Sequence, residues 1–322
     1  MRETPKPTVN ILGMKKIFLA ASFIFVLLTG TKTVSAQYYF FDDTYFDKPV
    51  LYEAGISAGA MNCLTDLGGK KGIGKKFIKD LNTGYTHFTG GIFFSASYKN
   101  MFSMRLEGAF GTISGDDKVL IGITDIAKQR YNRNQSFKSS ITDVTLMLEA
   151  HPLFIFVDWL AKDKTAPRYS PYIVGGIGYF SFNPQTKLGN RYVDLQPLHT
   201  EGQGFAEYPD RKEYKLNQLM IPLGLGVKYE LSPLINLRGE FLYRKTFTDY
   251  IDDVSTTYID PALFSKYLTG GKLTNALAIY DKQRLPIAGV DGKRGTATNN
   301  DGYFTASLKI SVVIGRDRIR KY

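Results

Sequence analysis

Residues 303–314 read YFTASLKISVVI, and apolar side chains occupy every second position of this stretch from Phe304 to Ile314. A period of two is typical of a β-strand with one apolar and one polar face. The same alternation recurs near residues 102–110, 144–149, 219–230 and 237–244, and more weakly in the Gly- and aromatic-rich segments 51–62, 88–98 and 170–182. We therefore predict an all-β chain of eight strands, an even number that can close into an antiparallel barrel.

The connections between these strands alternate between short and long. The short ones are 99–101, 157–169 and 231–234, and the long ones are 63–87, 115–138, 183–215 and 249–301. Outer-membrane barrels have short periplasmic turns and long external loops, whereas a soluble sandwich has no reason to follow this order. The sequence therefore predicts a transmembrane β-barrel over residues 51–315, with the N-terminal end on the periplasmic side.

The N-terminal segment has the pattern of a secretory signal peptide over residues 1–36. A basic Met14-Lys15-Lys16 precedes an apolar run from Ile17 to Leu28, and Val34-Ser35-Ala36 resembles a cleavage site. The apolar run is shorter than the ~20 residues of a membrane-spanning helix. An outer-membrane location with a cleaved signal peptide follows, and the start codon, Met1 or Met14, stays open.

The composition restricts the chemistry. The formal net charge is +11, and the chain has one Cys and three His. One Cys excludes a disulfide framework and a multi-cysteine zinc site. No basic–aromatic motif for nucleic acids is present. We expect an exported basic protein to contact lipid and lipopolysaccharide phosphates, with no nucleic acid or small-molecule substrate.

In a membrane barrel the polar strand faces line the interior, and a barrel of eight strands is only wide enough for its own side chains. These faces carry both signs of charge, which predicts a paired, filled interior and disfavours a diffusion porin. The predicted luminal charges are Arg105, Glu107, Asp143, Glu149, Lys228, Glu230, Arg238, Glu240, Arg244 and Lys309.

Histidines at positions 87, 151 and 199 would suit a lipid-modifying enzyme at the rim of the barrel, which also needs a nucleophile within hydrogen-bond reach. The GxSxG match at Gly55-Ile56-Ser57-Ala58-Gly59 lies inside the predicted strand 51–62, so it is not the strand-to-helix turn of a nucleophile elbow. We therefore expect no catalytic residues and no enzymatic activity.

Two charged clusters lie in the predicted external loops. Asp249, Asp252, Asp253 and Asp260 offer oxygen ligands for Ca²⁺ but lack the EF-hand spacing, and a solvated loop base is the plainer interpretation. The other cluster either contacts lipopolysaccharide phosphates or is simply solvated, and consists of Lys70, Lys71, Lys75, Lys76 and Lys79. We predict no metal or other cofactor.

The two ends of the mature chain both fall on the periplasmic side. Segment 37–50 is aromatic and acidic, residues 316–322 form a basic tail, and the two segments could pair with each other. An exposed aromatic stretch favours a partner or a groove. The candidate partner-binding residues are Tyr38, Tyr39, Phe40, Phe41, Tyr45, Phe46, Arg316, Arg318 and Arg320.

Several stretches together resemble a known family. The two most specific are LQPLHTEGQG at 195–204 and RKTFTDYIDDVS at 244–255; the others are GTISGDD at 111–117, RNQSFK at 133–138, SPY at 170–172, FNP at 182–184 and IPLGLGVKY at 221–229. They are similar to the Bacteroidota outer-membrane barrels that include PorG of the type IX secretion system, from about residue 50 to 314.

This resemblance implies a non-enzymatic outer-membrane protein that anchors or organises the secretion machinery. Its implied partners are the proteins of a periplasmic ring of the PorK/PorN kind, and it brings no catalytic residues. An alternative remains a structural or adhesive barrel that binds external ligands through its long loops.

Overall fold

The computed structural model describes residues 45–67, 82–121, 127–157, 167–280, 282–283 and 292–318. The predicted signal peptide and the five lysines between Lys70 and Lys79 lie outside these ranges.

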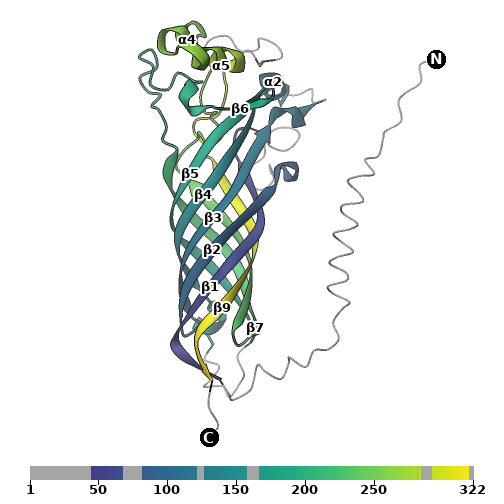
Figure 1. The fold of residues 1–322 in the computed structure, drawn as a ribbon, viewed down its shortest axis with the longest axis vertical. Helices are drawn as coiled ribbons and strands as arrows, with labels where there is room; N and C mark the ends of the chain where they lie inside the picture. Colours follow the sequence, from purple (N-terminus) through teal and green to yellow (C-terminus); the bar gives the residue numbers. More distant parts are fainter. Residues whose placement is uncertain are drawn as a thin grey trace, which may run out of the picture. The chain divides into compact units, whose positions relative to one another are not determined.

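Eight strands form a closed antiparallel barrel (Figure 1), as the sequence predicted. Each strand pairs with the next one along the barrel wall, and pairing between the first and last closes the ring. The strands are β1 (Tyr45–Leu64), β2 (His87–Tyr98), β3 (Phe102–Asp116), β4 (Ser136–Ala150), β5 (Tyr169–Leu188), β7 (Asn217–Ser232), β8 (Ile235–Thr246) and β9 (Gly302–Arg318). A short strand, β6 (Arg191–Asp194), pairs with the end of β5 and stands outside the ring.

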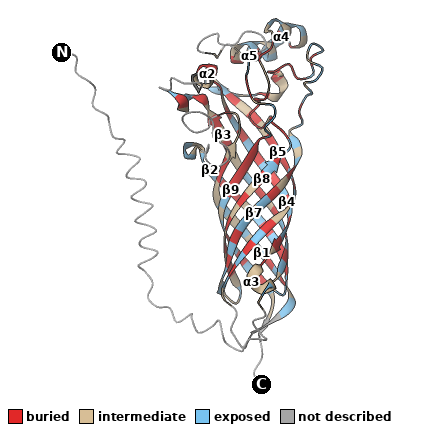
Figure 2. Cartoon of the chain, turned by 180° about the vertical axis from the view of Figure 1, so that it is seen from behind, coloured by how far each residue is buried: buried red, intermediate tan, exposed pale blue. Residues whose placement is uncertain are grey.

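The polarity of the barrel is the inverse of that of a soluble protein. Buried and exposed residues alternate along the strands (Figure 2), and the exposed ones are mainly apolar. On β4, Leu148 is 67% exposed whereas the neighbouring Glu149 is 1% exposed. On β9, Lys309 is buried between the exposed Leu308 and Ile310. The polar faces therefore point into the barrel and the apolar faces point outward.

Short turns lie at one end of the barrel. The β2–β3 turn places Lys99 and Asn100 at positive φ, as a tight hairpin requires, and β7 and β8 are joined by Pro233-Leu234. The fourth strand ends at Ala150, earlier than the predicted 157–169 connection implied, because Pro152 begins helix α3 (Pro152–Ile155).

The long connections lie at the opposite end and contain the other helices. These are α2 (Ala127–Arg133), α4 (Ala262–Tyr267) and α5 (Gly270–Tyr280), with the 3₁₀ turns η3 (Thr83–Tyr85), η4 (Asp117–Leu120) and η5 (Gln196–Leu198). In the described part of the chain, no helix has both the length and the apolar character to cross a membrane.

The first and last paired strands extend a few residues beyond the predicted barrel boundaries at 51 and 315. β1 begins at Tyr45 and β9 ends at Arg318, and Tyr45 pairs with Arg318 while Asp47 pairs with Arg316. The predicted N-terminal segment and basic tail therefore pair with each other where they are described. This pairing extends the two strands because each supplies hydrogen-bond partners to the other.

Candidate functional site

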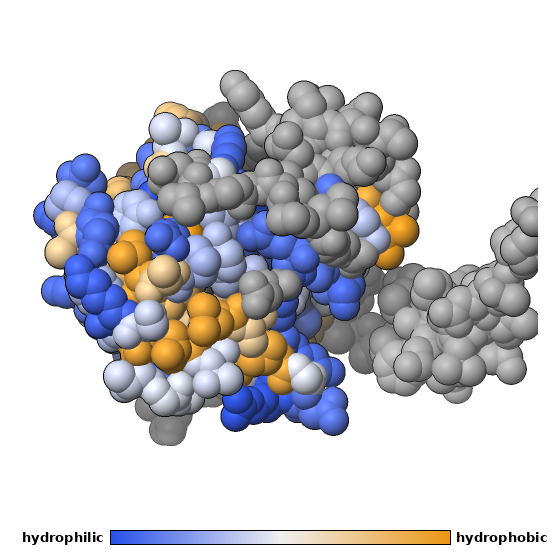
Figure 3. Space-filling model, turned by 90° about the horizontal axis from the view of Figure 1, so that it is seen from above, coloured by the Kyte–Doolittle hydropathy of each residue, from blue (hydrophilic) through white to orange (hydrophobic). Residues whose placement is uncertain are grey.

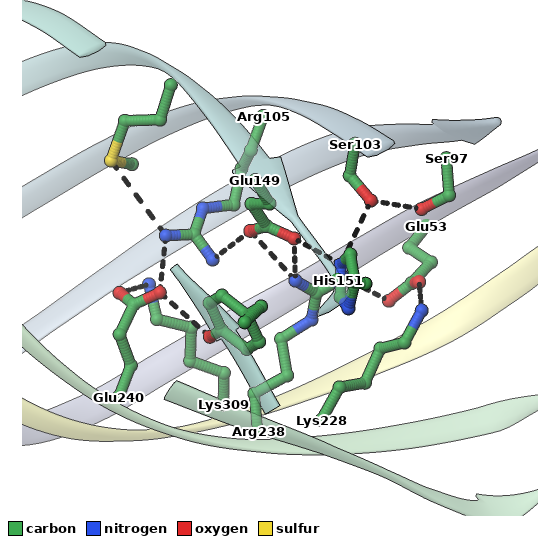
Figure 4. A network of polar contacts seen from close by, with 12 residues as sticks. Glu53, Ser97, Ser103, Arg105, Glu149, His151, Lys228, Arg238, Glu240 and Lys309 are labelled. Atoms are coloured by element: carbon green, nitrogen blue, oxygen red, sulfur yellow. Dashed lines mark hydrogen bonds and ion pairs between the residues drawn. The ribbon is translucent and has the colours of Figure 1, made fainter. Parts of the chain in front are cut away.

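The half of the barrel interior nearest the short turns is filled by eight charged side chains, which we call the luminal charge network. Figure 4 shows this network without Glu107. Each side chain occupies an inward position of the period-two pattern. The network consists of Glu53 on β1, Arg105 and Glu107 on β3, Glu149 on β4, Lys228 on β7, Arg238 and Glu240 on β8, and Lys309 on β9. Glu53 was missed by the sequence analysis, since its Gly-rich segment alternates only weakly.

Arg105 contacts three of the carboxylates. Its Nη1 lies 2.6 Å from Glu149 Oε1, its Nη2 lies 2.5 Å from Glu240 Oε2, and its Nε lies 3.2 Å from Glu107 Oε2. The Arg105 side chain is fully buried. A buried guanidinium needs several carboxylates to offset its lost hydration, and three are provided.

Arg238 makes a second set of bridges from the opposite wall. Its Nη1 donates to both oxygens of Glu149, at 2.9 and 2.6 Å, and its Nη2 donates to Glu53 Oε2 at 2.9 Å. Glu149 therefore accepts from Arg105 and Arg238 together, and the two guanidinium groups share one carboxylate at the centre of the network.

The two lysines complete the pairing. Lys309 Nζ lies 2.9 Å from Glu240 Oε1 and 2.6 Å from Glu107 Oε1, and Lys228 Nζ lies 3.5 Å from Glu53 Oε1. Four acidic and four basic groups thus compensate each other, which confirms the prediction of a mixed-sign, filled interior.

Between the network and the short turns, three serine hydroxyl groups and one histidine close the end of the barrel. His151 Nδ1 lies 2.8 Å from Ser170 Oγ, and its Nε2 lies 3.4 Å from Ser103 Oγ, which in turn lies 2.7 Å from Ser97 Oγ. Glu149 Oε2 is 3.5 Å from His151 Nε2. All five side chains are buried, so this Ser–His–Glu arrangement presents no surface to a substrate.

The other two histidines lie elsewhere. His87 begins β2, and its Nε2 lies 2.6 Å from Ser114 Oγ at the external rim. His199 adopts a left-handed backbone conformation in the β6–β7 connection and packs against Phe205. The structure therefore does not bring the three histidines into one site.

The half of the interior nearest the long loops is apolar, which the sequence analysis did not predict. Inward side chains of the strands pack with side chains that descend from the loops. The strand residues include Met61, Ile113, Phe137, Ile141, Phe180, Phe182 and Met220, and the loop residues are Leu67, Tyr214, Ile251 and Val254. Between the two halves, Arg244 Nε lies 2.9 Å from Asp143 Oδ2. The mouth of the barrel is thus sealed by its own loops.

Beyond the mouth, the long β5–β7 and β8–β9 connections form a cap over the barrel. A buried cluster, which we call the external clasp, fastens these two connections and consists of Thr200, Glu201, Asp253 and Arg294. Arg294 Nη1 donates to Thr200 Oγ1 at 2.7 Å, to Glu201 Oε1 at 3.0 Å and to the Asp253 carbonyl oxygen at 2.9 Å. Burial between two carboxylates makes this guanidinium a fixed cation at the centre of the cap.

Glu201 is the most heavily bonded acceptor of the clasp. It accepts from the backbone N–H groups of Ser255 and Thr256, at 2.9 and 2.8 Å, and from the Thr256 hydroxyl at 2.7 Å. The stretches 195–204 and 244–255, which carry the family resemblance most specifically, therefore meet here and hold the cap together.

The four loop aspartates that suggested calcium do not form one site. Asp253 belongs to the external clasp, and Asp260 is at the start of α4, where it accepts from the Ala262 N–H at 2.9 Å. Asp249 and Asp252 instead lie with Asp66 and Asp301, and we call these four carboxylates the acidic junction.

Three of the four loop aspartates are buried, so the expectation of a solvated loop base is wrong for Asp249, Asp252 and Asp253, whose exposed fractions are 6%, 0% and 0%. Burial first, and then the neighbouring carboxylates, raise the pKa of Asp249 to about 8 and of Asp252 to about 7. Among the residues that the structure describes, no group of three His, Cys, Asp or Glu side chains is arranged to hold a metal ion.

The exterior carries an apolar belt between two rows of aromatic side chains. The rows are exposed near the ends of the strands, and the side chains between them are exposed aliphatics such as Leu106, Leu146 and Ile310. The row near the short turns contains Tyr98, Phe102, Tyr169 and Tyr229, and the row near the loops contains Phe88, Phe110, Tyr179 and Phe247. Such a belt between aromatic girdles is the surface that membrane-spanning barrels present to lipid.

The candidate partner-binding residues are only partly described. Tyr38, Tyr39, Phe40, Phe41 and Arg320 lie outside the described residues, and the backbones of Tyr45, Phe46 and Arg318 belong to the paired ends of β1 and β9. Arg316 bonds the Glu230 carboxylate and donates to the Pro233 carbonyl oxygen at 3.0 Å. Glu230, a predicted luminal charge, is thus half-buried near the short turns and outside the network.

Comparisons with known proteins give one family and several barrels of similar fold. The profile of a family described as "Domain of unknown function (DUF6089)" matches residues 38–262. No curated protein matches the chain in sequence.

Solved structures of similar fold include the N-terminal β-barrel domain of Pseudomonas aeruginosa OprF, at 7% identity and a TM-score of 0.33, covering 84% of this chain and 100% of that one. Neisserial surface protein A is 9% identical, with a TM-score of 0.35 and 82% and 99% of the two chains covered. A major outer membrane protein of Thermus thermophilus is 14% identical, with a TM-score of 0.35 and 83% and 100% covered.

Proposed function

Because this chain belongs to the DUF6089 family and folds into a barrel with an apolar exterior, we propose that it is a non-enzymatic outer-membrane protein of the type IX secretion system. In this role it anchors or organises a periplasmic ring of the PorK/PorN kind at the outer membrane. Its lipid-facing belt holds it in the membrane, and the end with the short turns faces the periplasm.

The sealed interior is the observation that carries this proposal. A solute crossing the barrel would have to separate the eight charges of the luminal charge network and displace the apolar layer above them. Separating a buried ion pair costs about 3–5 kcal/mol for each partner removed. A barrel closed in this way suits an anchor better than a channel.

The resemblance to PorG-type barrels supports the link to secretion. The two stretches that carry this resemblance most specifically, 195–204 and 244–255, meet in the external clasp. At the periplasmic end, the paired termini of β1 and β9 bring residues 45–47 beside residues 316–318. We propose this end as the surface for the ring proteins.

The test combines secretion with co-purification. Deleting the gene should leave signal-bearing cargo in the periplasm, and complementation should restore export. A variant without residues 37–46 should insert into the membrane and lose the ring proteins on co-purification. As a matched control, changing Lys70, Lys71, Lys75, Lys76 and Lys79 to Gln alters only an external loop and should retain the ring. Unchanged secretion in the deletion strain would contradict the proposed function.

The absence of enzymatic activity is part of the same proposal. Changing His87 and His199 to Gln should leave the composition of the surrounding lipid and lipopolysaccharide unchanged. A lipid modification that disappears in this double variant would make the protein a rim enzyme instead.

The ordered cap favours one alternative, an adhesive barrel that binds external ligands. Helices α4 and α5 pack with η5 around a core that includes Phe205, Phe264 and Ile279. Viewed from above, apolar side chains gather on the outward face among hydrophilic ones (Figure 3), and Leu277 on α5 is 37% exposed. Transplanting residues 189–216 and 247–301 onto another barrel should then transfer binding, while secretion would not depend on the gene.

A further inference from the structure

The acidic junction joins three parts of the chain that are far apart in sequence. Asp66 follows β1, Asp249 and Asp252 follow β8, and Asp301 precedes β9. The junction therefore lies where the β1–β2 loop and both ends of the β8–β9 loop meet at the barrel mouth.

Three of the four carboxylates hold backbone N–H groups of these loops. Asp252 accepts from Leu67 at 2.9 Å, and Asp66 Oδ2 accepts from Thr296 at 2.6 Å. Asp301 bridges the residues around Asp249, since its carboxylate accepts from the Ile251 N–H at 2.9 Å and its own N–H donates to the Thr248 carbonyl oxygen at 2.9 Å.

Asp249 lacks such partners. Its side chain is 6% exposed, and neither carboxylate oxygen has a hydrogen-bond partner of good geometry among the described residues, although the Ser255 hydroxyl is close by. An ionised carboxylate that is buried without donors is costly, whereas a protonated one is not.

The charged groups around the junction leave this cost uncompensated. Arg133 is held by Asp117, at 2.8 Å, and Arg294 is held by the external clasp. The further titratable groups that face the junction are Glu201, Arg130, Lys293, Cys63 and Tyr243. Of these groups, the cations Arg130 and Lys293 act on Asp66. Asp249 instead faces the carboxylates of Asp66, Asp252 and Glu201.

We propose that the acidic junction is a proton-dependent latch, which fastens the β8–β9 loop to the barrel mouth when Asp249 is protonated and loosens it in an alkaline medium. The junction lies on the external side in the proposed topology, so the pH of the surroundings sets its state. Burial and the neighbouring carboxylates raise the pKa of Asp301 as well, so a second proton strengthens the same response.

The test is hydrogen–deuterium exchange on the full chain in lipid vesicles at pH 6 and pH 9, with a chelator present and with rates corrected for intrinsic exchange. The amides of Leu67, Ile251, Val254 and Thr296 report on the junction, because each donates to one of its carboxylates. Their protection should fall roughly tenfold or more between the two pH values in the wild type.

In Asp249→Asn this dependence on pH should largely disappear. In the control Asp260→Asn, which removes a half-buried loop carboxylate outside the junction, it should persist. Asp301→Asn should also weaken it, which keeps the test valid if the first variant does not fold. Equal protection at both pH values in the wild type would overturn the proposal. Protection restored at pH 9 by added Ca²⁺, but only with Asp249 present, would overturn it too, since the junction would then be a cation site.

Discussion

Arg238 on β8 donates two hydrogen bonds to the carboxylate of Glu149 on β4, at 2.9 and 2.6 Å, across the interior of the barrel. These strands are not neighbours in the sheet: two strands separate them in one direction around the ring and four in the other. The pair therefore ties two separate parts of the barrel wall together.

Removing one member of this pair should destabilise the barrel strongly. Arg238→Met leaves Glu149 with one cation and Glu53 with a weaker one, so we expect a loss of about 3–5 kcal/mol in the free energy of unfolding. Urea unfolding from vesicles measures the loss. The control Lys266→Met breaks the surface pair with Glu207 and should leave the unfolding midpoint unchanged. An equal response of both variants would show that the luminal pair has no special role.

A charge on the outer belt should also destabilise the barrel, because it must enter lipid. Leu106 is 52% exposed on β3, between the two aromatic rows. Leu106→Arg should cost about 2–4 kcal/mol in the free energy of unfolding from vesicles. Tyr192→Arg, at an equally exposed position on β6 outside the ring, is the control and should cost far less. Tolerance of arginine at 106 would contradict a lipid-facing belt.

Loss of the Glu201 carboxylate should open the cap without unfolding the barrel. Glu201→Ala removes the acceptor of two backbone N–H groups and one hydroxyl and leaves Arg294 with fewer partners. Limited proteolysis of intact cells should then cut within 247–301 at least several-fold faster, while heat-modifiable migration of the barrel stays normal. The matched variant Glu213→Ala, whose exposed carboxylate accepts from Gln196, should be cut at the wild-type rate.

The acidic junction predicts the direction of a pH effect on stability. The pKa of Asp249 is about 8 in the folded chain and 3.8 ordinarily, so the folded state binds this proton more tightly, and stability falls as the pH rises from about 4 to about 8. Asp249→Asn should therefore stabilise the chain above pH 8, by roughly 1–3 kcal/mol, and have little effect near pH 4. Thermal melting at pH 4, 6 and 9 measures the difference; stabilisation of the same size at every pH would contradict it.

Part of the site followed from the sequence alone. The positions of Arg105, Glu149, Arg238 and Lys309 in a period-two pattern placed them on the inner face, and they are there. Glu53 was missed because glycines interrupt the pattern around it. The apolar layer of Phe180 and Phe182 was missed for another reason: inward apolar residues are stable near the mouth only because loop side chains cover them.

The amino-acid sequence was enough to predict the number of strands, the alternation of short and long connections and the side of each strand that faces inward. Each of these follows from local spacing, since side chains of a strand alternate every residue. The tertiary structure alone decided which charges pair and which carboxylates meet. Arg238 reaches Glu149 from 89 residues away, while Asp66 joins Asp249 from another loop and Asp301 joins it from the far end of the same loop. Such contacts depend on the register and closure of the whole barrel, which bring distant residues to the same height on opposite walls.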